Sequence, residues 1–311
     1  MHAIQETHIE IGSAGNQPVH FASDCTPGDW QMAQVSFKTH FQTADNVRVI
    51  VTANNEGVNP GVENPAVVGV VAAVNTTDFT LLGRNSDCAE GNAGFYYMAV
   101  EELGHPPPGE RVDLRLGILQ QRSFSRDCQP GDRNVWSPSF SSPLPSGERA
   151  ALVTGCNLNV RSYNLPAVGM SRNLDVNGFQ LAARNSAACL PLPGDSGESA
   201  FYYVAGIEGP TPPRDRFWID SGVVEPKSFA ASCMSFKDVG SHWASWEVYF
   251  SRPFLSPPVV LLTGKDVGAA VVGLAQDVTT HGFTLTGFNS DCGPGSAQFY
   301  WVAIGCGSGC G

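Results

Sequence analysis

Short apolar runs separated by polar turns recur along the whole chain. Residues 67–74 (Val-Val-Gly-Val-Val-Ala-Ala-Val) are followed by a polar turn at 75–78 and a second apolar run that begins at Phe79. The segment 271–286 repeats the same order. Runs of this length that are rich in β-branched and aromatic residues, bounded by turn residues, predict strand, turn and strand. No window combines a sustained 3.6-residue period with capping signals, so we expect an all-β chain with few helices.

The pattern belongs to a unit that occurs three times. Blocks of the form Leu-x-x-x-Asn-Ser precede Cys88, Cys189 and Cys292, and each is followed by an aromatic run that begins Phe-Tyr. A second cysteine recurs upstream, at Cys25, Cys128 and Cys233. Pro-rich joints at 104–109 and 209–213 are typical of stiff spacers between units. We therefore expect three repeats, at 1–103, 110–208 and 214–305, followed by a Gly/Cys tail at 306–311.

Six of the nine cysteines fall into three equivalent pairs, and their spacing predicts disulfides. The pairs are separated by 63, 61 and 59 residues and comprise Cys25–Cys88, Cys128–Cys189 and Cys233–Cys292. The alternative is that these are small buried residues retained in a duplicated core. Disulfides predict an oxidising, extracellular location, although the first residues, 1–7, hold no apolar core of a signal peptide.

The three other cysteines have different surroundings. Cys156 ends the apolar run 150–156, which predicts a buried free thiol. Cys306 and Cys310 lie in the Gly-rich tail, where they can pair with each other or link two chains.

About seven short strands per repeat predict an antiparallel β-sandwich. The third copy, through the segments 250–262, 282–283 and 300–304, resembles the H-type lectin domain of snail agglutinins and slime-mould discoidins. That family opens with a short strand, for which the counterparts here are 8–12, 113–117 and 218–222. Copies one and two follow the pattern less closely. Because the family assembles as trimers with sugar sites between protomers, the resemblance implies a pseudo-trimer within one chain that binds galactose or N-acetylgalactosamine.

The resemblance also implies where sugar contacts would lie. In the family an acidic residue after the first cysteine holds the sugar; here those loops carry Asp29, Asp132 and Asp238. Asp is also a common turn residue, which is the alternative interpretation. The family's Arg and its aromatic–His pair are missing at the corresponding positions, near Ala66, Ala167 and Ala270 and in the loops 89–92, 190–194 and 293–295. The standard site is therefore not expected to be intact. The recurrent Asn85, Asn185 and Asn289 either replace these contacts or satisfy loop backbone groups.

Composition excludes several function classes. A net charge of −11 and a pI near 5.0 argue against a nucleic-acid surface, and no apolar stretch is long enough to cross a bilayer. Residues 194–197 (Gly-Asp-Ser-Gly) resemble a serine-protease segment, but no His and Asp partners have the required context. No metal motif is present, so we expect neither catalysis nor a cofactor.

Two functions remain open from the sequence. The first is a multivalent lectin that recognises glycans at the loops and seams between repeats. The second is an extracellular structural or assembly protein, such as a fibre, coat or adhesion component, that uses the same sandwich as a building block.

Overall fold

A computed structural model describes most of the strands and the turns between them. The described residues are 8–21, 30–54, 67–85, 91–101, 114–124, 133–144, 150–156, 167–185, 197–207, 217–230, 243–266, 271–289 and 294–306. They hold strands, turns and one 3-10 turn, η1 (Ala44–Asn46), and no α-helix among them. The all-β prediction is confirmed.

The strands form three sheets, and each sheet combines strands of two repeats. We name the sheets by those repeats. In order across sheet 1/3, the strands are β1 (His8–Phe21), β6 (Gly91–Glu101), β3 (Val47–Asn54), β17 (Val271–Gln276), β18 (Gly282–Asn289) and β15 (Trp243–Tyr249). Across sheet 1/2 they are β2 (Gln31–Ser36), β5 (Asp78–Asn85), β4 (Val67–Val74), β9 (Ala150–Cys156), β12 (Gly197–Ile207) and β7 (Arg115–Phe124).

Sheet 2/3 follows the same plan. Its strands, in order, are β13 (Phe217–Val223), β19 (Gly295–Cys306), β16 (Val259–Asp266), β10 (Ala167–Arg172), β11 (Gln180–Asn185) and β8 (Asn134–Trp136), with β14 (Lys227–Phe229) also paired to β19. Apart from the extra strand β14, each sheet is therefore the union of two three-stranded halves, one from each of two repeats.

The two halves of one repeat pack against each other as a sandwich. Aromatic side chains from both halves meet in its interior, at equivalent places in the three repeats. The ring of Tyr203, on β12, has its centroid 5.3 Å from that of Phe179, which immediately precedes β11. The corresponding ring pairs, measured between centroids, are Phe79 and Tyr97 at 5.2 Å and Phe283 and Trp301 at 6.0 Å. The expected sandwich is thus present in each repeat.

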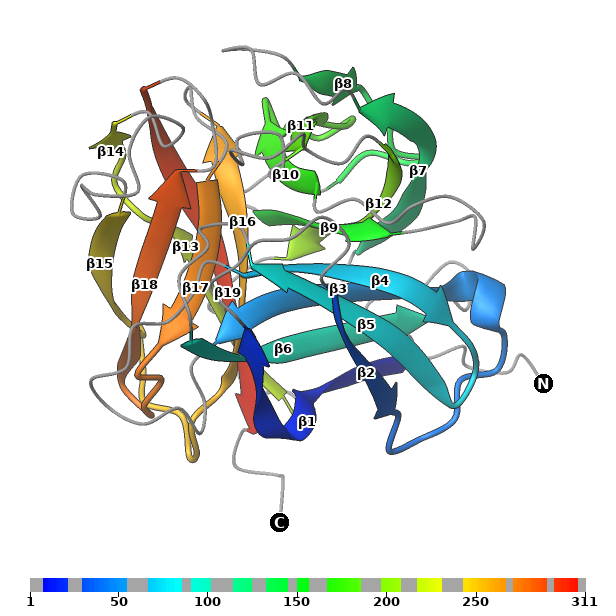
Figure 1. Cartoon of the computed structure of the whole chain (residues 1–311), viewed down its shortest axis with the longest axis horizontal. Helices are drawn as coiled ribbons and strands as arrows, with labels where there is room; N and C mark the ends of the chain where they lie inside the picture. The colour runs from blue at the N-terminus through cyan, green and yellow to red at the C-terminus, as the bar shows by residue number, and fades with distance from the viewer. Residues whose placement is uncertain are drawn as a thin grey trace.

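Parallel strand pairs join the repeats. Ala53 of β3 pairs with Leu274 of β17, and equivalent short parallel ladders join β9 to β4 and β16 to β10. We call these three ladders the seams. Repeat 1 meets repeat 3, repeat 3 meets repeat 2, and repeat 2 meets repeat 1, so the arrangement closes into a ring around the point where β3, β9 and β16 meet (Figure 1). This is the pseudo-trimer.

Individual strands agree with the sequence patterns or extend them. The predicted run 67–74 is β4, and the run after the turn is part of β5. The opening strands were expected at 8–12, 113–117 and 218–222; β1, β7 and β13 occupy these places, and β1 and β7 continue well beyond them. The repeat boundaries and the tail remain predictions.

The third residue of each expected opening strand has a charged side chain that forms hydrogen bonds with the backbone of a nearby turn. Glu10 is buried and accepts hydrogen bonds from the backbone N–H groups of Lys38 and Thr39, at 2.9 and 3.0 Å. Asp220 likewise accepts a hydrogen bond from the backbone N–H of Ser251, at 2.6 Å. Repeat 2 has Arg115 there, which instead donates to the carbonyl of Ser142 at 2.9 Å. The position thus keeps its anchoring role although its charge is reversed.

Replacing Tyr97 by phenylalanine should weaken this anchor in repeat 1. The Tyr97 hydroxyl donates to Glu10 at 2.8 Å, so its loss should lower the free energy of unfolding by about 1–3 kcal/mol. Burial, and secondly Glu10, raises the pKa of the Tyr97 phenol. Because folding favours the protonated phenol, its contribution is intact below the unfolded-state pKa of about 10 and is lost as the pH rises beyond it.

Urea denaturation at pH 8 and at pH 11 tests both effects. Y97F should lose less stability than the wild type between the two pH values. Tyr249→Phe is the matched control, because that ring is 76% exposed. Equal alkaline losses in the wild type and Y97F would contradict the argument.

Candidate functional site

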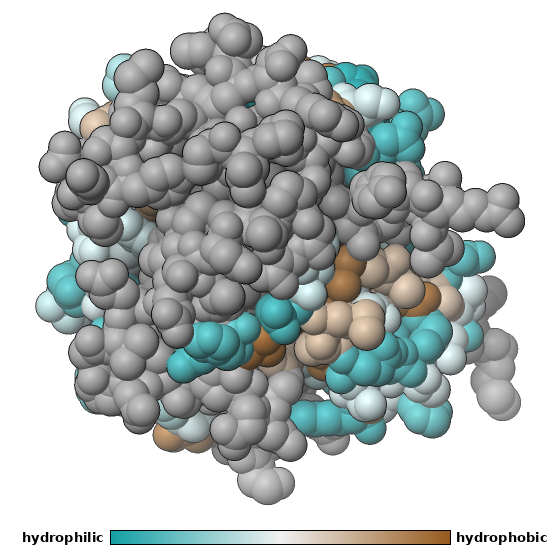
Figure 2. Space-filling model, viewed as in Figure 1, coloured by the Kyte–Doolittle hydropathy of each residue, from teal (hydrophilic) through white to brown (hydrophobic). Residues whose placement is uncertain are grey.

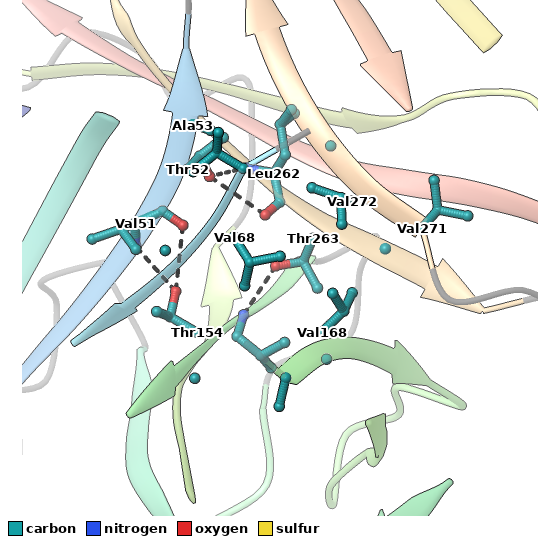
Figure 3. Close-up of a pocket in the computed structure, with 18 of the residues that line it drawn as sticks. Val51, Thr52, Ala53, Val68, Thr154, Val168, Leu262, Thr263, Val271 and Val272 are labelled. Carbon is teal, nitrogen blue, oxygen red and sulfur yellow. Dashed lines mark hydrogen bonds between the residues drawn. The ribbon is translucent and has the colours of Figure 1, made fainter. Parts of the chain in front are cut away.

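Three equivalent threonines lie where the repeats meet, and we call them the threonine ring: Thr52, Thr154 and Thr263. Each Oγ1 accepts a hydrogen bond from a backbone N–H of another repeat (Figure 3). Leu262 donates to Thr52 at 2.9 Å, Val51 to Thr154 at 3.0 Å and Val153 to Thr263 at 3.0 Å. The three bonds form a closed cycle through all three repeats.

The threonine ring satisfies strand edges that the seams leave open. Val51 pairs with Tyr97 on one side of β3, whereas the parallel ladder to β17 on the other side begins only at Ala53. The N–H of Val51 therefore needs an acceptor other than a neighbouring strand. A threonine hydroxyl is short enough to reach it and has two lone pairs. The same reasoning holds for Val153 and Leu262.

A small pocket adjoins the threonine ring, and we call it the axial pocket. Its volume is about 70 Å³. Equivalent segments of all three repeats line it, so it lies on the pseudo-threefold axis. The lining consists of 51–53, 67–69, 153–155, 167–169, 262–264 and 271–273, with Phe299.

In repeats 1 and 3, the described residues that follow the expected sugar loops lie level with the axial pocket. Trp30, which follows Asp29, continues β2 beside Arg84 of β5, and its ring lies 5.9 Å from the guanidinium. Arg84 in turn pairs with Val68, which lines the axial pocket. In repeat 3, Trp243 pairs with Phe288, which pairs with the lining residue Val272. Trp30 and Trp243 therefore lie level with pocket-lining residues, each separated from them by one strand; Asp29 and Asp238 lie outside the described residues.

The three asparagines occupy one register position. Asn85, Asn185 and Asn289 pair with Val67, Ala167 and Val271, which all line the axial pocket. Asn185 and Asn289 are buried, at 3% and 0% exposed. The Asn289 side chain donates from Nδ2 to the Ala230 carbonyl at 2.6 Å. In repeat 3 this supports the interpretation that the asparagine holds loop backbone, since a buried amide offers no surface to a sugar.

Other expected site residues lie outside the described residues. This holds for Asp29, Asp132 and Asp238, for the six cysteines of the expected disulfides, for the Asn85 side chain, and for Cys310 and the Cys306 side chain. Cys156 is the exception among the cysteines. It is a buried free thiol, as predicted, and burial raises its pKa.

The seams are not chemically alike. Asn54, Cys156 and Lys265 each follow a ring threonine by two residues and pair across a seam with Ala275, Val71 and Ser171. The Nζ of Lys265 lies 5.4 Å from the centre of the Tyr300 ring. The guanidinium carbon of Arg48 lies 5.7 Å from the centre of the Tyr202 ring. The repeats thus share a backbone plan but present an amide, a thiol and an amine at equivalent seam positions.

Sequence reasoning missed the threonine ring and the buried arginines. Each ring threonine follows an apolar run (Val-Ile-Val, Ala-Leu-Val and Val-Leu-Leu), and its recurrence there was the available signal. Arg84 and Arg184 recur before Asn85 and Asn185, and each is only 2% exposed. A buried charge at a repeated position signals a structural or binding role.

Comparison with known proteins gives no relative: no protein-family model, curated protein or solved structure matches the chain. Across the described ranges, no helix is long and apolar enough to cross a membrane. The same residues contain no cluster of His, Cys, Asp or Glu that could hold a metal ion.

Proposed function

We propose that this protein is a non-catalytic, multivalent glycan-binding protein related to the H-type lectins, with its sites at the axial end of the seams. The proposal rests chiefly on one observation: Trp30 and Trp243, the first described residues after the acidic loops of repeats 1 and 3, both lie level with the axial pocket of a closed three-repeat ring. The resemblance to the H-type lectins implies this kind of assembly. Disulfides within the repeats and an extracellular location belong to the same proposal.

Sugar recognition requires polar groups with fixed directions and a partly apolar surface. The end of the molecule around the axial pocket combines both kinds of group. Trp30 and Trp243, which follow the acidic segments of repeats 1 and 3, are partly buried aromatic rings, and the Arg84 guanidinium supports the Trp30 ring at 5.9 Å. Figure 2 shows apolar and hydrophilic side chains side by side over the region of β4 and β5.

The three acidic loops would give three weak sites on one rigid body. Such an arrangement gains avidity when a target presents sugars at matching spacing, without any new contact. Because the family's Arg and aromatic–His positions are not retained, we propose a site in which the aspartates carry most of the specificity. Galactose-type sugars are the first class to examine, on the resemblance alone.

A glycan array with the intact protein tests the proposal. We expect binding to a restricted set of glycans, and at least about tenfold weaker binding when Asp29, Asp132 and Asp238 are all replaced by alanine, because each carboxylate hydrogen bond is worth roughly 1.5–3 kcal/mol. Asp45→Ala is the control, since Asp45 is exposed in η1, outside the axial-pocket lining.

Two results would decide against the lectin. One is an absence of binding across a broad array at high protein concentration. The other is binding that the triple aspartate variant retains in full. If particles or filaments then persist in the presence of any added sugar, the alternative function as a structural component would be favoured.

A further inference from the structure

Repeat 3 exposes two large apolar side chains near the end of β17 that lies away from the axial pocket. Tyr249, the last residue of β15, is 76% exposed, and Leu255, in the loop that follows, is 70% exposed. That loop is held to the turn between β17 and β18 by the backbone N–H groups of Phe250 and Phe254, which donate to carbonyls of the turn at 2.9 and 2.8 Å. Because the two accepting carbonyls belong to consecutive residues, Tyr249 and Leu255 both border this one turn.

The other two repeats lack these apolar side chains at the same place. Their loops make the same two backbone hydrogen bonds to the equivalent turn, and the donors are Phe37 and Phe41 in repeat 1 and Phe140 and Leu144 in repeat 2. The position of Tyr249 holds a serine in both repeats, and the position of Leu255 holds a glutamine in repeat 1; all three are exposed, namely Ser36, Ser139 and Gln42. The shared fold therefore does not require apolar residues here, and neighbouring exposed apolar side chains mark an interaction surface.

Both signs of charge flank the two apolar side chains. Glu247 lies two residues before Tyr249, on the same face of β15, and Arg252 lies in the loop before Leu255; both charged side chains are exposed. The guanidinium carbon of Arg252 lies 5.2 Å from the centre of the Trp218 ring, a contact that holds this charge at the surface. We call Glu247, Tyr249, Arg252 and Leu255 the repeat 3 patch. Such a patch is complementary to itself when two copies meet about a twofold axis, because each acid can then face the base of the other copy.

The C-terminal tail leaves the fold beside the repeat 3 patch. β19 ends at Cys306, and the residue before it packs against the patch loop: a Cβ at Gly305 would lie 2.7 Å from Cδ1 of Phe254 and 3.1 Å from Cβ of Pro258. The chain from Cys306 to Cys310 spans at most about 14 Å. Two patches that meet about a twofold axis therefore bring the tail cysteines of two chains into one region, where the link between chains that the sequence left open becomes possible.

We propose that the repeat 3 patch docks a second copy of this chain in a symmetric dimer. Tyr and Arg are enriched among the residues that carry most of the binding energy at protein interfaces, so Tyr249 and Arg252 are the expected anchors. Leu255 adds to the apolar centre of the contact. Because only repeat 3 has the patch, association stops at two copies. The dimer is independent of the proposed glycan sites, since β17 reaches the axial pocket with its other end.

Sedimentation equilibrium of a C306S/C310S chain measures the docking without any link through the tail. We expect a dimer that dissociates on dilution. Y249S/L255Q, added to this chain, introduces the residues of repeat 1 and should weaken association at least about tenfold. Met32→Ser is the matched control, because Met32 is 73% exposed on β2, outside the patch, and its loss should leave association unchanged. All of these side chains are exposed, so the thermal unfolding midpoints should hardly change.

A chain with Cys306→Ser alone keeps one tail cysteine and tests where the interface lies. With oxidised glutathione, the Cys310 thiolate of one chain displaces one glutathione thiol, and the thiolate of the second chain then displaces the other, which leaves a disulfide between the chains. We expect this linked dimer on a nonreducing gel, in larger amount than with Y249S/L255Q, and none with C306S/C310S. A monomer at every concentration, undiminished association of Y249S/L255Q, or a dimer whose Cys310 residues do not link would each overturn the proposal.

Discussion

Replacing Thr52, Thr154 and Thr263 together by valine should lower the free energy of unfolding by about 3–9 kcal/mol, the sum of three unsatisfied backbone N–H groups at about 1–3 kcal/mol each. Valine has nearly the shape of threonine but cannot accept a hydrogen bond. Val51, Val153 and Leu262 would then have no acceptor at the open strand edges. Because typical stabilities are about 5–15 kcal/mol, the variant should be close to unfolding.

Chemical denaturation of the purified chain measures this effect. The matched control replaces the same three residues by serine, which keeps each hydroxyl and deletes one methyl group per site. That control should lose roughly 1 kcal/mol per site, from lost burial alone. If the valine variant were as stable as the serine variant, the ring hydrogen bonds would contribute nothing and the account of the open edges would be wrong.

Replacing Gly169 by alanine should cost about 1–3 kcal/mol, because the new methyl group would overlap two buried side chains. A Cβ at Gly169 would lie 2.8 Å from Cε1 of Phe201 and 3.0 Å from Cγ2 of Val153. Phe201 is fully buried, so a shift of its ring would disturb the side chains packed around it. Repeats 1 and 3 have the same approach, with Gly69 against Phe95 and Gly273 against Phe299.

A double-mutant cycle tests this contact specifically. Phe201→Leu removes the ring atoms that a new methyl group would meet, so Gly169→Ala should cost less in that background, with a coupling of at least about 0.5 kcal/mol. Gly155→Ala is the control: its Cβ would lie no closer than 3.4 Å to any neighbour, and repeat 1 has Ala53 at the equivalent position. Additive effects of the Gly169 and Phe201 changes would contradict the steric argument.

The local elements were predictable because they depend on neighbours in the sequence. The turn at 75–78 illustrates this: Asn75 accepts hydrogen bonds through Oδ1 from the Thr77 and Asp78 N–H groups, at 2.7 and 2.8 Å. Asn has this capacity in any fold that contains the turn. The burial of Cys156 was predictable for a similar reason, since every residue of its run, 150–156, is buried in β9.

The candidate site was less accessible to sequence reasoning. Whether Asn185 and Asn289 contact a sugar or hold loop backbone depends on exposure, which a repeat pattern does not encode; both side chains are buried. The threonine ring depends on which strand edge faces which repeat. Thr52 and Leu262 are 210 residues apart, and no local pattern links them.

The sequence by itself determined that this chain is all β, that its unit occurs three times, and that a turn and a buried aromatic strand stand at fixed places in each unit. These features follow from the alternation of apolar runs with polar turns, from the chemistry of the turn residues and from the internal repetition of the sequence. Only the tertiary structure decided that the sheets pass from one repeat to the next and that three hydroxyls close a cycle at their centre. Parallel pairing at a seam involves only two residues per strand, and its stability comes from burial and closure of the ring, which exist only in the assembled fold.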